Sequence, residues 1–269
     1  MKVTYIGGGN MAAALIGGWL KAGGHAAEVS VLEVDAARRA ALTRDYGVAT
    51  PAQAETALAG AQIVVLAVKP QQMRAACSAI APYLGQATVL SIAAGIRMRE
   101  LARWLNTQHV VRAMPNTPAL IGQGISGVAA LPSVSASARQ SAEAILKAAG
   151  AVVWLDDEAQ LDAVTALSGS GPAYVFFFLE ALIRSGEALG LTASQARLLA
   201  VHTVIGAGQL AAQSDDDISV LRERVTSKGG TTAAGLQSMT QDHVAEALVR
   251  AVRAAHQRAV ELGNELGND

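Results

Sequence analysis

A glycine-rich segment near the N-terminus has the residue types and the spacing of a phosphate-binding turn. An apolar run, Val3 to Ile6, leads into Gly-Gly-Gly-Asn-Met-Ala at residues 7–12, and a helical pattern follows. In such a turn the first glycine permits a tight bend, the second lets the backbone approach a pyrophosphate, and the small final residue keeps helix and strand close. The N–H groups at the helix start would then hold the phosphates. The sequence therefore predicts a dinucleotide-binding turn, the alternative being a turn that serves packing alone.

The end of the second predicted strand bears on which dinucleotide would bind. Residues 31–35 read Val-Leu-Glu-Val-Asp, which places Glu33 at the end of that strand. A carboxylate there accepts hydrogen bonds from the ribose hydroxyls of NAD, and its charge repels the 2′-phosphate of NADP. Glu33 therefore favours NADH, although Arg38 and Arg39 on the following helix could partly reverse this preference. The alternative is that Glu33 is only a solvated strand end.

Three further segments are candidates for the same site. Val68-Lys69-Pro70 and the stretch Arg112 to Pro118 each follow a predicted strand, and ligands of open α/β sheets bind beyond the carboxyl ends of strands. The polar loop Ser168 to Tyr174 precedes an apolar helix near the predicted domain junction, where substrate pockets often form. Each also has a structural interpretation, respectively a strand stop, a rigid turn and a helix cap.

A second glycine-rich loop lies in the C-terminal half. Residues 225–232 read Val-Thr-Ser-Lys-Gly-Gly-Thr-Thr and open another helical pattern. Backbone N–H groups of such a loop bind a carboxylate by the same physics that binds phosphate. The loop therefore predicts an anionic group on the substrate. It does not indicate a nucleotide cradle, because the spacing of a P-loop is absent.

The elements that must position these residues change in type near the middle of the chain. Up to about Leu155, short β-branched runs alternate with Ala-rich helical stretches, which predicts an α/β domain with a doubly wound parallel sheet. We expect strands at Val3–Ile6, Val29–Leu32, Ile63–Val68, Thr88–Ile92, Val110–Ala113, Ser126–Ala130 and Val152–Leu155. We expect helices between them at Ala36–Asp45, Gln71–Tyr83, Met98–Trp104 and Ser135–Ala149.

After Asp156 the β-branched runs disappear and helical spacing takes over. The pattern predicts helices at Ala159–Leu167, Pro172–Leu189, Ala193–Ala212, Ser219–Arg224, Thr231–Met239 and Asp242–Leu262. We therefore predict two domains, a dinucleotide-binding domain of residues 1–155 and an all-α domain of residues 156–269, with 263–269 as a frayed end. The apolar run Tyr174 to Ile183 is far shorter than the ~20 residues of a spanning helix and contains Glu180, so we expect a buried helix.

Charge and composition limit the classes of partner. The 269 residues carry 21 basic and 22 acidic side chains, a net charge of -1, without a block of one sign. This pattern indicates neither nucleic acid nor an anionic membrane as partner and favours a small molecule. The single Cys77 and five scattered histidines offer no disulfide pair and no metal cluster. We expect a reducing cytosol and no metal.

Taken in order, these segments resemble pyrroline-5-carboxylate reductase. The matching motifs are Gly-Gly-Gly-Asn-Met-Ala, Val-Lys-Pro, Met-Pro-Asn-Thr-Pro, Gly-Ser-Gly-Pro-Ala-Tyr and Val-Thr-Ser-Lys-Gly-Gly-Thr-Thr. The resemblance implies a Rossmann-type domain, an all-α dimerisation and substrate-binding domain, and a cytoplasmic homodimer that can assemble into a decamer. It also implies an oxidoreductase acting on CH–NH donors. Such an enzyme transfers hydride from NAD(P)H to the C=N bond of 1-pyrroline-5-carboxylate, giving L-proline in the last step of proline biosynthesis.

The resemblance also assigns roles to single residues. Thr232 matches the catalytic threonine that hydrogen-bonds the ring nitrogen of the substrate, while Ser227, Gly230 and Thr231 match positions that hold the substrate carboxylate. The residues expected at the cofactor are Gly7, Gly8, Gly9, Asn10, Met11, Ala12, Glu33, Val68, Lys69, Pro70, Met114 and Asn116. Two departures stand out. Lys228 replaces a proline of many members, and Glu33 and Val34 replace polar and basic side chains, which leaves NADPH preference open.

Two other interpretations remain at this point. A β-hydroxyacid dehydrogenase would use a lysine on an interdomain helix as general acid, but no lysine occurs between Asp156 and Val225. A nucleotide-sensing protein without turnover would keep the α/β domain. It would not need the 227–232 loop, whose hydroxyls and amides suit an anion.

Overall fold

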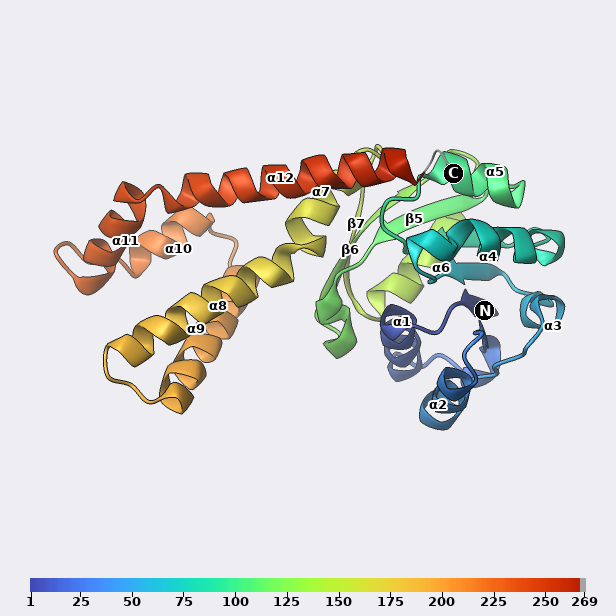
Figure 1. Ribbon diagram of the computed structural model, residues 1–269, viewed down its shortest axis with the longest axis horizontal. Coiled ribbons are helices and arrows are strands. Elements are labelled where there is room, and N and C mark those ends of the chain that lie inside the picture. The colour runs from blue at the N-terminus through green and yellow to red at the C-terminus, as the bar shows by residue number, and fades with distance from the viewer. Residues whose placement is uncertain (267–269) are drawn as a thin grey trace. The chain divides into compact units, whose positions relative to one another are not determined.

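The computed structural model describes residues 1–266, which form two compact units. Unit 1 comprises residues 1–170 and the chain from Ala255 onward, and unit 2 comprises Gly171–Ala254. The predicted boundary after Leu155 follows a change in secondary structure and stays a prediction. The compact units differ from it because α7 (Gln160–Val164) and the last turns of α12 (Val244–Glu265) belong with the sheet of unit 1 (Figure 1).

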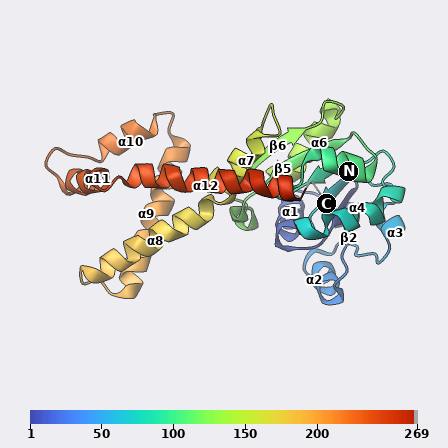
Figure 2. The same ribbon diagram turned by 45° about the horizontal axis from the view of Figure 1, so that its top comes forward.

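Unit 2 contains helices and, in residues 171–254, no strand. Helices α8 (Gly171–Ala188) and α9 (Ala193–Gln213) pack as a pair, side by side in both views (Figures 1 and 2). The all-α character of this half is therefore confirmed. Thr192 starts α9 with a capping box, in which its hydroxyl accepts from the Gln195 N–H and the Gln195 side chain accepts from the Thr192 N–H. Helices α10 (Ile218–Arg224), α11 (Thr231–Gln241) and the first turns of α12 complete the unit.

The apolar face of α8 is not buried within the chain. The prediction of a buried helix at Tyr174–Ile183 is wrong here, because α8 contains no buried residue and Phe176 and Phe177 are 61% and 71% exposed. The helical stretch 160–188 is also long and apolar enough to cross a membrane by length and composition alone. Exposed apolar surface of this extent marks an interaction site. The hydropathy of the sequence indicates that such side chains are buried, but it does not indicate whether they are buried within their own chain or against another one.

Unit 1 is built on a seven-stranded sheet in the order β2-β1-β3-β4-β5-β6-β7. The strands are β1 Val3–Ile6, β2 Val29–Leu32, β3 Ile63–Leu66, β4 Thr88–Ser91, β5 Val110–Met114, β6 Gly124–Ala130 and β7 Gly150–Trp154. All seven predicted strands are present, and the α/β fold class is confirmed. The parallel prediction fails at one place, because β6 runs antiparallel to β5. The connecting segment 115–123 is too short for the crossover that a parallel pair needs.

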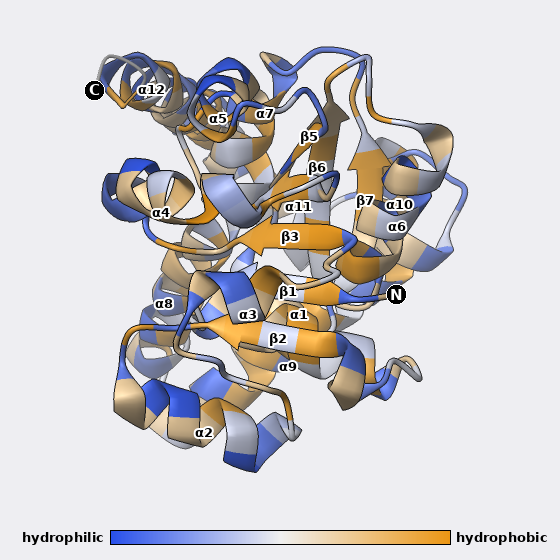
Figure 3. Ribbon diagram, turned by 90° about the vertical axis from the view of Figure 1, so that its right-hand side faces the viewer, coloured by the Kyte–Doolittle hydropathy of each residue, from blue (hydrophilic) through white to orange (hydrophobic). Residues whose placement is uncertain are grey.

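Helices cover both faces of the sheet, and the strands are accordingly apolar along their length (Figure 3). In β3 all four residues are buried, with Val65 facing one apolar cluster and Val64 and Leu66 facing the other. The first cluster includes side chains of α1 (Asn10–Lys21), α2 (Ala36–Tyr46) and α6 (Ala136–Lys147). The second includes those of α3 (Ala54–Leu58), α4 (Met73–Ile80), α5 (Met98–Leu105) and α7. Burial on both faces is the reason that these strands read as continuous apolar runs.

The C-terminal helix extends further than predicted. The frayed end expected at 263–269 is wrong for its first residues, because α12 continues to Glu265. Gly263 is buried, and a Cβ at this position would lie 2.6 Å from Nη2 of Arg97. A side chain there would displace the Arg97 guanidinium from its place against the helix. Residues 267–269 lie outside the described residues.

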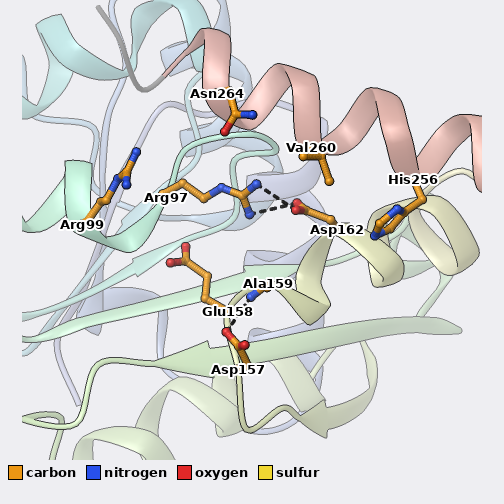
Figure 4. A pocket seen from close by; sticks show the side chains of 9 residues that line it. All are labelled: Arg97, Arg99, Asp157, Glu158, Ala159, Asp162, His256, Val260 and Asn264. Atoms are coloured by element: carbon orange, nitrogen blue, oxygen red, sulfur yellow. Dashed lines mark hydrogen bonds and ion pairs between the residues drawn. The ribbon is translucent and has the colours of Figure 1, made fainter.

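Two ion pairs connect residues 158–162 to β5 and to the segment after β4. Arg97 donates from Nη1 and Nη2 to Asp162 at 3.0 and 2.8 Å, in a hollow that α12 lines with Val260 (Figure 4). Arg112 is 2% exposed and donates to Oε1 of Glu158 at 2.9 Å. Burial lowers the pKa of the Arg112 guanidinium, and Glu158 opposes that effect. Each buried charge thus depends on its partner.

We expect Glu158→Ala to lower the free energy of unfolding by about 3 kcal/mol, because it leaves the Arg112 charge buried without a partner. In the double variant Arg112→Met with Glu158→Gln, the buried charge is gone and the Gln oxygen can still accept the Met98 N–H, which Glu158 accepts at 2.7 Å. Urea unfolding at one fixed protomer concentration measures both. A double variant as unstable as Glu158→Ala would contradict this explanation.

Candidate functional site

The strand register brings most of the expected cofactor residues to one edge of the sheet. Ile6 pairs with Leu66, Leu66 with Ser91, and Ser91 with Arg112. The carboxyl ends of β1, β3, β4 and β5 therefore lie in line. The segments 7–12, 68–70 and 114–116 all leave the sheet at this edge, where open α/β sheets bind their ligands.

The glycine turn has the geometry of an anion site. Gly7 has φ +92°, donates its N–H to the Leu32 carbonyl at 2.8 Å, and lies where a Cβ would come within 2.9 Å of a Val68 methyl. Gly9 is the N-cap of α1 and provides no side-chain cap, and the first turn, Asn10 to Ala12, contains no acidic residue. The first N–H groups of α1 thus have no intrahelical partner and no competing carboxylate. Space over Gly9 is open, since a Cβ there would have only Arg38 Nη1 nearby, at 3.7 Å.

The Glu33 carboxylate is held in place by two backbone groups. Its Oε2 accepts the N–H of Gly8 at 2.8 Å, and its Oε1 accepts the N–H of Asp35 at 2.9 Å. Asp35 in turn caps α2 by accepting the N–H of Arg38, a hydrogen bond that, together with nearby positive charge, lowers the pKa of this carboxyl. These bonds show that the Glu33 carboxylate is ordered, while its part in cofactor choice stays a prediction. Its negative charge has a fixed place beside the glycine turn.

The remaining strand-end residues differ in how they are engaged. Lys69 is exposed, and Pro70 opens a short 3₁₀ turn, Pro70–Gln72. Asn116 is buried, and both ends of its amide are used: Nδ2 donates to the Ser168 carbonyl at 3.2 Å, and Oδ1 accepts the Ile125 N–H at 2.9 Å. Asn116 therefore links the end of β5 to β6 and to the π-helical turn Thr165–Gly169. The sequence placed Asn116 at the sheet edge but contained no signal for this linkage.

Met114 also reaches this π-helical turn. A Cβ at Gly169 would come within 2.7 Å of the Met114 terminal methyl. The structure therefore brings the Met-Pro-Asn segment and the Ser168–Gly169 segment, which the sequence analysis singled out separately, into contact.

One segment of this edge was missed in the sequence. Residues 92–95, Ile-Ala-Ala-Gly, follow β4 between the ends of β3 and β5. Ile92 and Ala93 are buried, so only backbone groups of this segment are suited to polar contacts. A search for polar side chains could not detect it. The end of the predicted strand Thr88–Ile92 was the available signal, because parallel neighbours end at the same edge.

The second glycine-rich loop lies in unit 2 and also starts a helix. Gly230 is the N-cap of α11, without a side-chain cap, and donates its N–H to the Ser227 carbonyl at 3.1 Å. The Ser227 hydroxyl lies against Gly230, so close that a Cβ on Gly230 would collide with it. Thr231 and Thr232 are the first residues of the helix and are exposed. The loop thus combines unpaired N–H groups with hydroxyl donors, which is suited to a carboxylate.

Family models match both halves of the chain. Residues 158–262 match the model described as pyrroline-5-carboxylate reductase dimerisation. Residues 2–95 match the model described as NADP oxidoreductase, coenzyme F420-dependent. The second description agrees with the dinucleotide-type turn at the start of the sheet.

Relatives and solved structures are similar over nearly the whole length. The pyrroline-5-carboxylate reductase of Pseudomonas aeruginosa is 46% identical over 269 residues, which cover 99% of this chain and 98% of the relative. A pyrroline-5-carboxylate reductase structure from Coxiella burnetii has a TM-score of 0.93 at 36% identity, covering 97% of this chain and 98% of that one. The Plasmodium falciparum pyrroline carboxylate reductase with NADP bound has a TM-score of 0.86 at 27% identity and covers 98% of both chains.

The open space over Gly9 allows a clean test of the glycine turn. We expect Gly9→Ala to change the free energy of unfolding by no more than about 1 kcal/mol, because the methyl group meets only Arg38 Nη1, at an ordinary contact distance of 3.7 Å. ADP-ribose binding should weaken by at least about tenfold, because the methyl group occupies the space that a pyrophosphate approaches. Calorimetry and urea unfolding measure the two effects. Gly8→Ala, whose Cβ would collide with Leu42, should lose stability as well as affinity. Unchanged ADP-ribose affinity in Gly9→Ala would contradict pyrophosphate binding at this turn.

Proposed function

The chain belongs to the pyrroline-5-carboxylate reductase family and catalyses the last step of proline biosynthesis. On this basis we propose which residues bind the substrate, which bind the cofactor, and which cofactor is preferred. When bound, the reduced nicotinamide supplies the hydride that the C=N carbon of 1-pyrroline-5-carboxylate accepts, and the ring nitrogen takes up a proton to give L-proline. The observation that carries the proposal is the start of α11, whose N-cap is a glycine without a side-chain cap and which lies in the motif Val-Thr-Ser-Lys-Gly-Gly-Thr-Thr.

The loop at α11 holds the substrate in this proposal. The N–H groups of Thr231 and Thr232, together with the Ser227 hydroxyl, bind the carboxylate. The Gly230 N–H, which the resemblance also assigns to the carboxylate, donates instead to the Ser227 carbonyl at 3.1 Å, so Gly230 takes part as the N-cap of α11. Lys228 adds positive charge nearby, which favours the same anion. The Thr232 hydroxyl donates a hydrogen bond to the ring nitrogen. A threonine hydroxyl is too weak an acid to be the primary proton donor, so its role is to orient the ring and relay a proton.

The edge of the sheet in unit 1 holds the cofactor. The residues from Gly7 to Ala12 bind the pyrophosphate through the uncapped start of α1. Val68, Lys69 and Pro70 border the nicotinamide from the end of β3, as do Met114 and Asn116 from the end of β5. The fit rests on the open space over Gly9, which a dinucleotide requires and which close packing in the chain does not explain.

We infer a preference for NADH within a family whose members also bind NADP. The Glu33 carboxylate, fixed by the Gly8 and Asp35 N–H groups, lies at the strand end where ribose hydroxyls of NADH donate hydrogen bonds. A 2′-phosphate would add negative charge beside it, and repulsion over a few ångströms near a surface costs on the order of 1 kcal/mol or more.

We also propose an assembly and a location for the enzyme. The exposed apolar side chains of α8 and α9, including Phe176, Phe177 and Leu198, supply the homodimer contact, since residues 158–262 match a dimerisation domain. Further assembly into a decamer and a cytoplasmic location complete this proposal.

The role of Thr232 is tested by comparing Thr232→Ala with Thr232→Ser. Loss of one hydrogen bond to a charged or reacting group costs about 1.5 to 3 kcal/mol, so kcat/KM for the imine should fall about tenfold to 100-fold in Thr232→Ala. Thr232→Ser keeps the hydroxyl and should stay within about threefold of the unmodified enzyme. NADH affinity, measured by calorimetry, should not change in either. Equal kcat/KM values for the Ala and Ser variants would contradict a role of the Thr232 hydroxyl in the reaction.

The role of Glu33 in cofactor choice is tested with Glu33→Gln, which removes the charge but keeps an oxygen for the Gly8 N–H. The ratio of kcat/KM for NADPH to that for NADH should rise about fivefold to tenfold, the effect of about 1 kcal/mol of repulsion. Asp35→Asn is the matched control, because it removes a neighbouring carboxylate and still caps α2. It should change the ratio less. An unchanged ratio in Glu33→Gln would contradict the NADH preference as explained here.

A further inference from the structure

The two arginines that follow Glu33 on α2 have different environments. Arg39 is half-buried, and its Nη1 donates to the carbonyl oxygens of Glu33 at 2.8 Å and Val34 at 2.9 Å. These bonds hold the turn between β2 and α2 in its conformation. The Arg39 guanidinium is therefore a structural group of this turn, occupied by backbone acceptors.

Arg38 is exposed, and among the described residues 1–266 its guanidinium has no hydrogen bond and no ion pair. Only its backbone N–H is engaged, by the Asp35 side chain. Its Nη1 lies 3.7 Å from the place of a Cβ on Gly9, beside the uncapped start of α1. No ion pair of 4.0 Å or less joins it to Glu33, although both side chains lie against adjacent glycines of the same turn. An unengaged guanidinium in this position is suited to binding a phosphate.

The Arg38 guanidinium lies beside Gly9, next to the space proposed for the pyrophosphate, but the element that carries Arg38 favours a different phosphate of the cofactor. The pyrophosphate has its donors in the N–H groups at the start of α1. Arg38 comes instead from the helix after β2, the element that carries the contacts to the adenosine ribose in this class of fold. A phosphate on the ribose 2′-oxygen would lie near Glu33 and would require a cation to offset that carboxylate. Of the two arginines, only Arg38 has a guanidinium without other partners.

We propose that Arg38 is the residue that binds the 2′-phosphate of NADPH and so permits NADPH to bind despite Glu33, while NADH binding does not use it. The inference rests on the proposed cofactor site and adds a specificity-determining residue to it. Glu33 and Arg38 then act in opposite directions on one ribose position, and the balance between them sets the cofactor ratio.

Calorimetric titration of the full-length Arg38→Ala variant tests this without turnover. NADPH and NADH differ only by the 2′-phosphate, as do adenosine 2′,5′-bisphosphate and AMP. We expect the affinity for NADPH and for the bisphosphate to fall by at least about tenfold, and that for NADH and AMP by less than about twofold. Arg44→Ala is the matched control on the same helix, because Arg44 is exposed and pairs with Asp45. It should change none of the four.

Two results would overturn the proposal. Equal weakening of NADPH and NADH would make Arg38 a pyrophosphate contact, and unchanged affinity for all four ligands would remove it from the cofactor site. Neither result depends on the reductase reaction. Failure of the proposed function would show instead as an enzyme that binds these ligands with the expected discrimination but reduces no 1-pyrroline-5-carboxylate.

Discussion

Parallel pairing places Ile6, Leu66 and Ser91 side by side, so the chain must leave the sheet along one edge after each of these strands. The ladder continues just beyond them, since the Gly7 N–H bonds to the Leu32 carbonyl and the Ala67 N–H to that of Ile6. Both faces of these strands are buried, and a slip of one residue would exchange the side chains of the two apolar clusters. The register is therefore strongly determined by packing. The positions of the glycine turn and of Glu33 depend on it.

The helix starts in the described part of the chain differ in how they are capped. Helices α2, α6 and α9 begin with side-chain caps from Asp35, Ser135 and Thr192, each a contribution of about 1 kcal/mol. Helices α1 and α11 begin instead at Gly9 and Gly230, which have no side chain to donate or accept. Their first N–H groups remain available to anions. Other helices, such as α3 and α10, also begin without a side-chain cap, but α1 and α11 have a glycine N-cap and lie in the motifs proposed to bind cofactor and substrate. In that proposal a bound ligand supplies the missing acceptors.

Much of the fold could be predicted from the sequence. Strands buried on both faces form continuous apolar runs, whereas helices buried on one face repeat apolar residues every three to four positions, so the two patterns differ. The direction of β6 could not, since it depends on the length of its connection to β5. Exposure of Phe176 and Phe177 was also hidden, because hydropathy does not distinguish the core of one chain from a contact between two. At the site, spacing identified the position of Glu33 but not its bonds to Gly8 and Asp35. The Asn116 linkage joins segments distant in sequence, which no local pattern reports.

The most direct test of the central claim follows a label through the reaction. NADH carrying deuterium at nicotinamide C4, on the transferred face, is incubated with the enzyme and 1-pyrroline-5-carboxylate, and the proline is examined by NMR. Direct hydride transfer predicts one deuterium on the δ-carbon of proline, the former C=N carbon, and none elsewhere. Proline without deuterium from both C4 epimers of the labelled cofactor, or oxidation of NADH without proline, would contradict the assignment of this chain as a reductase of the imine.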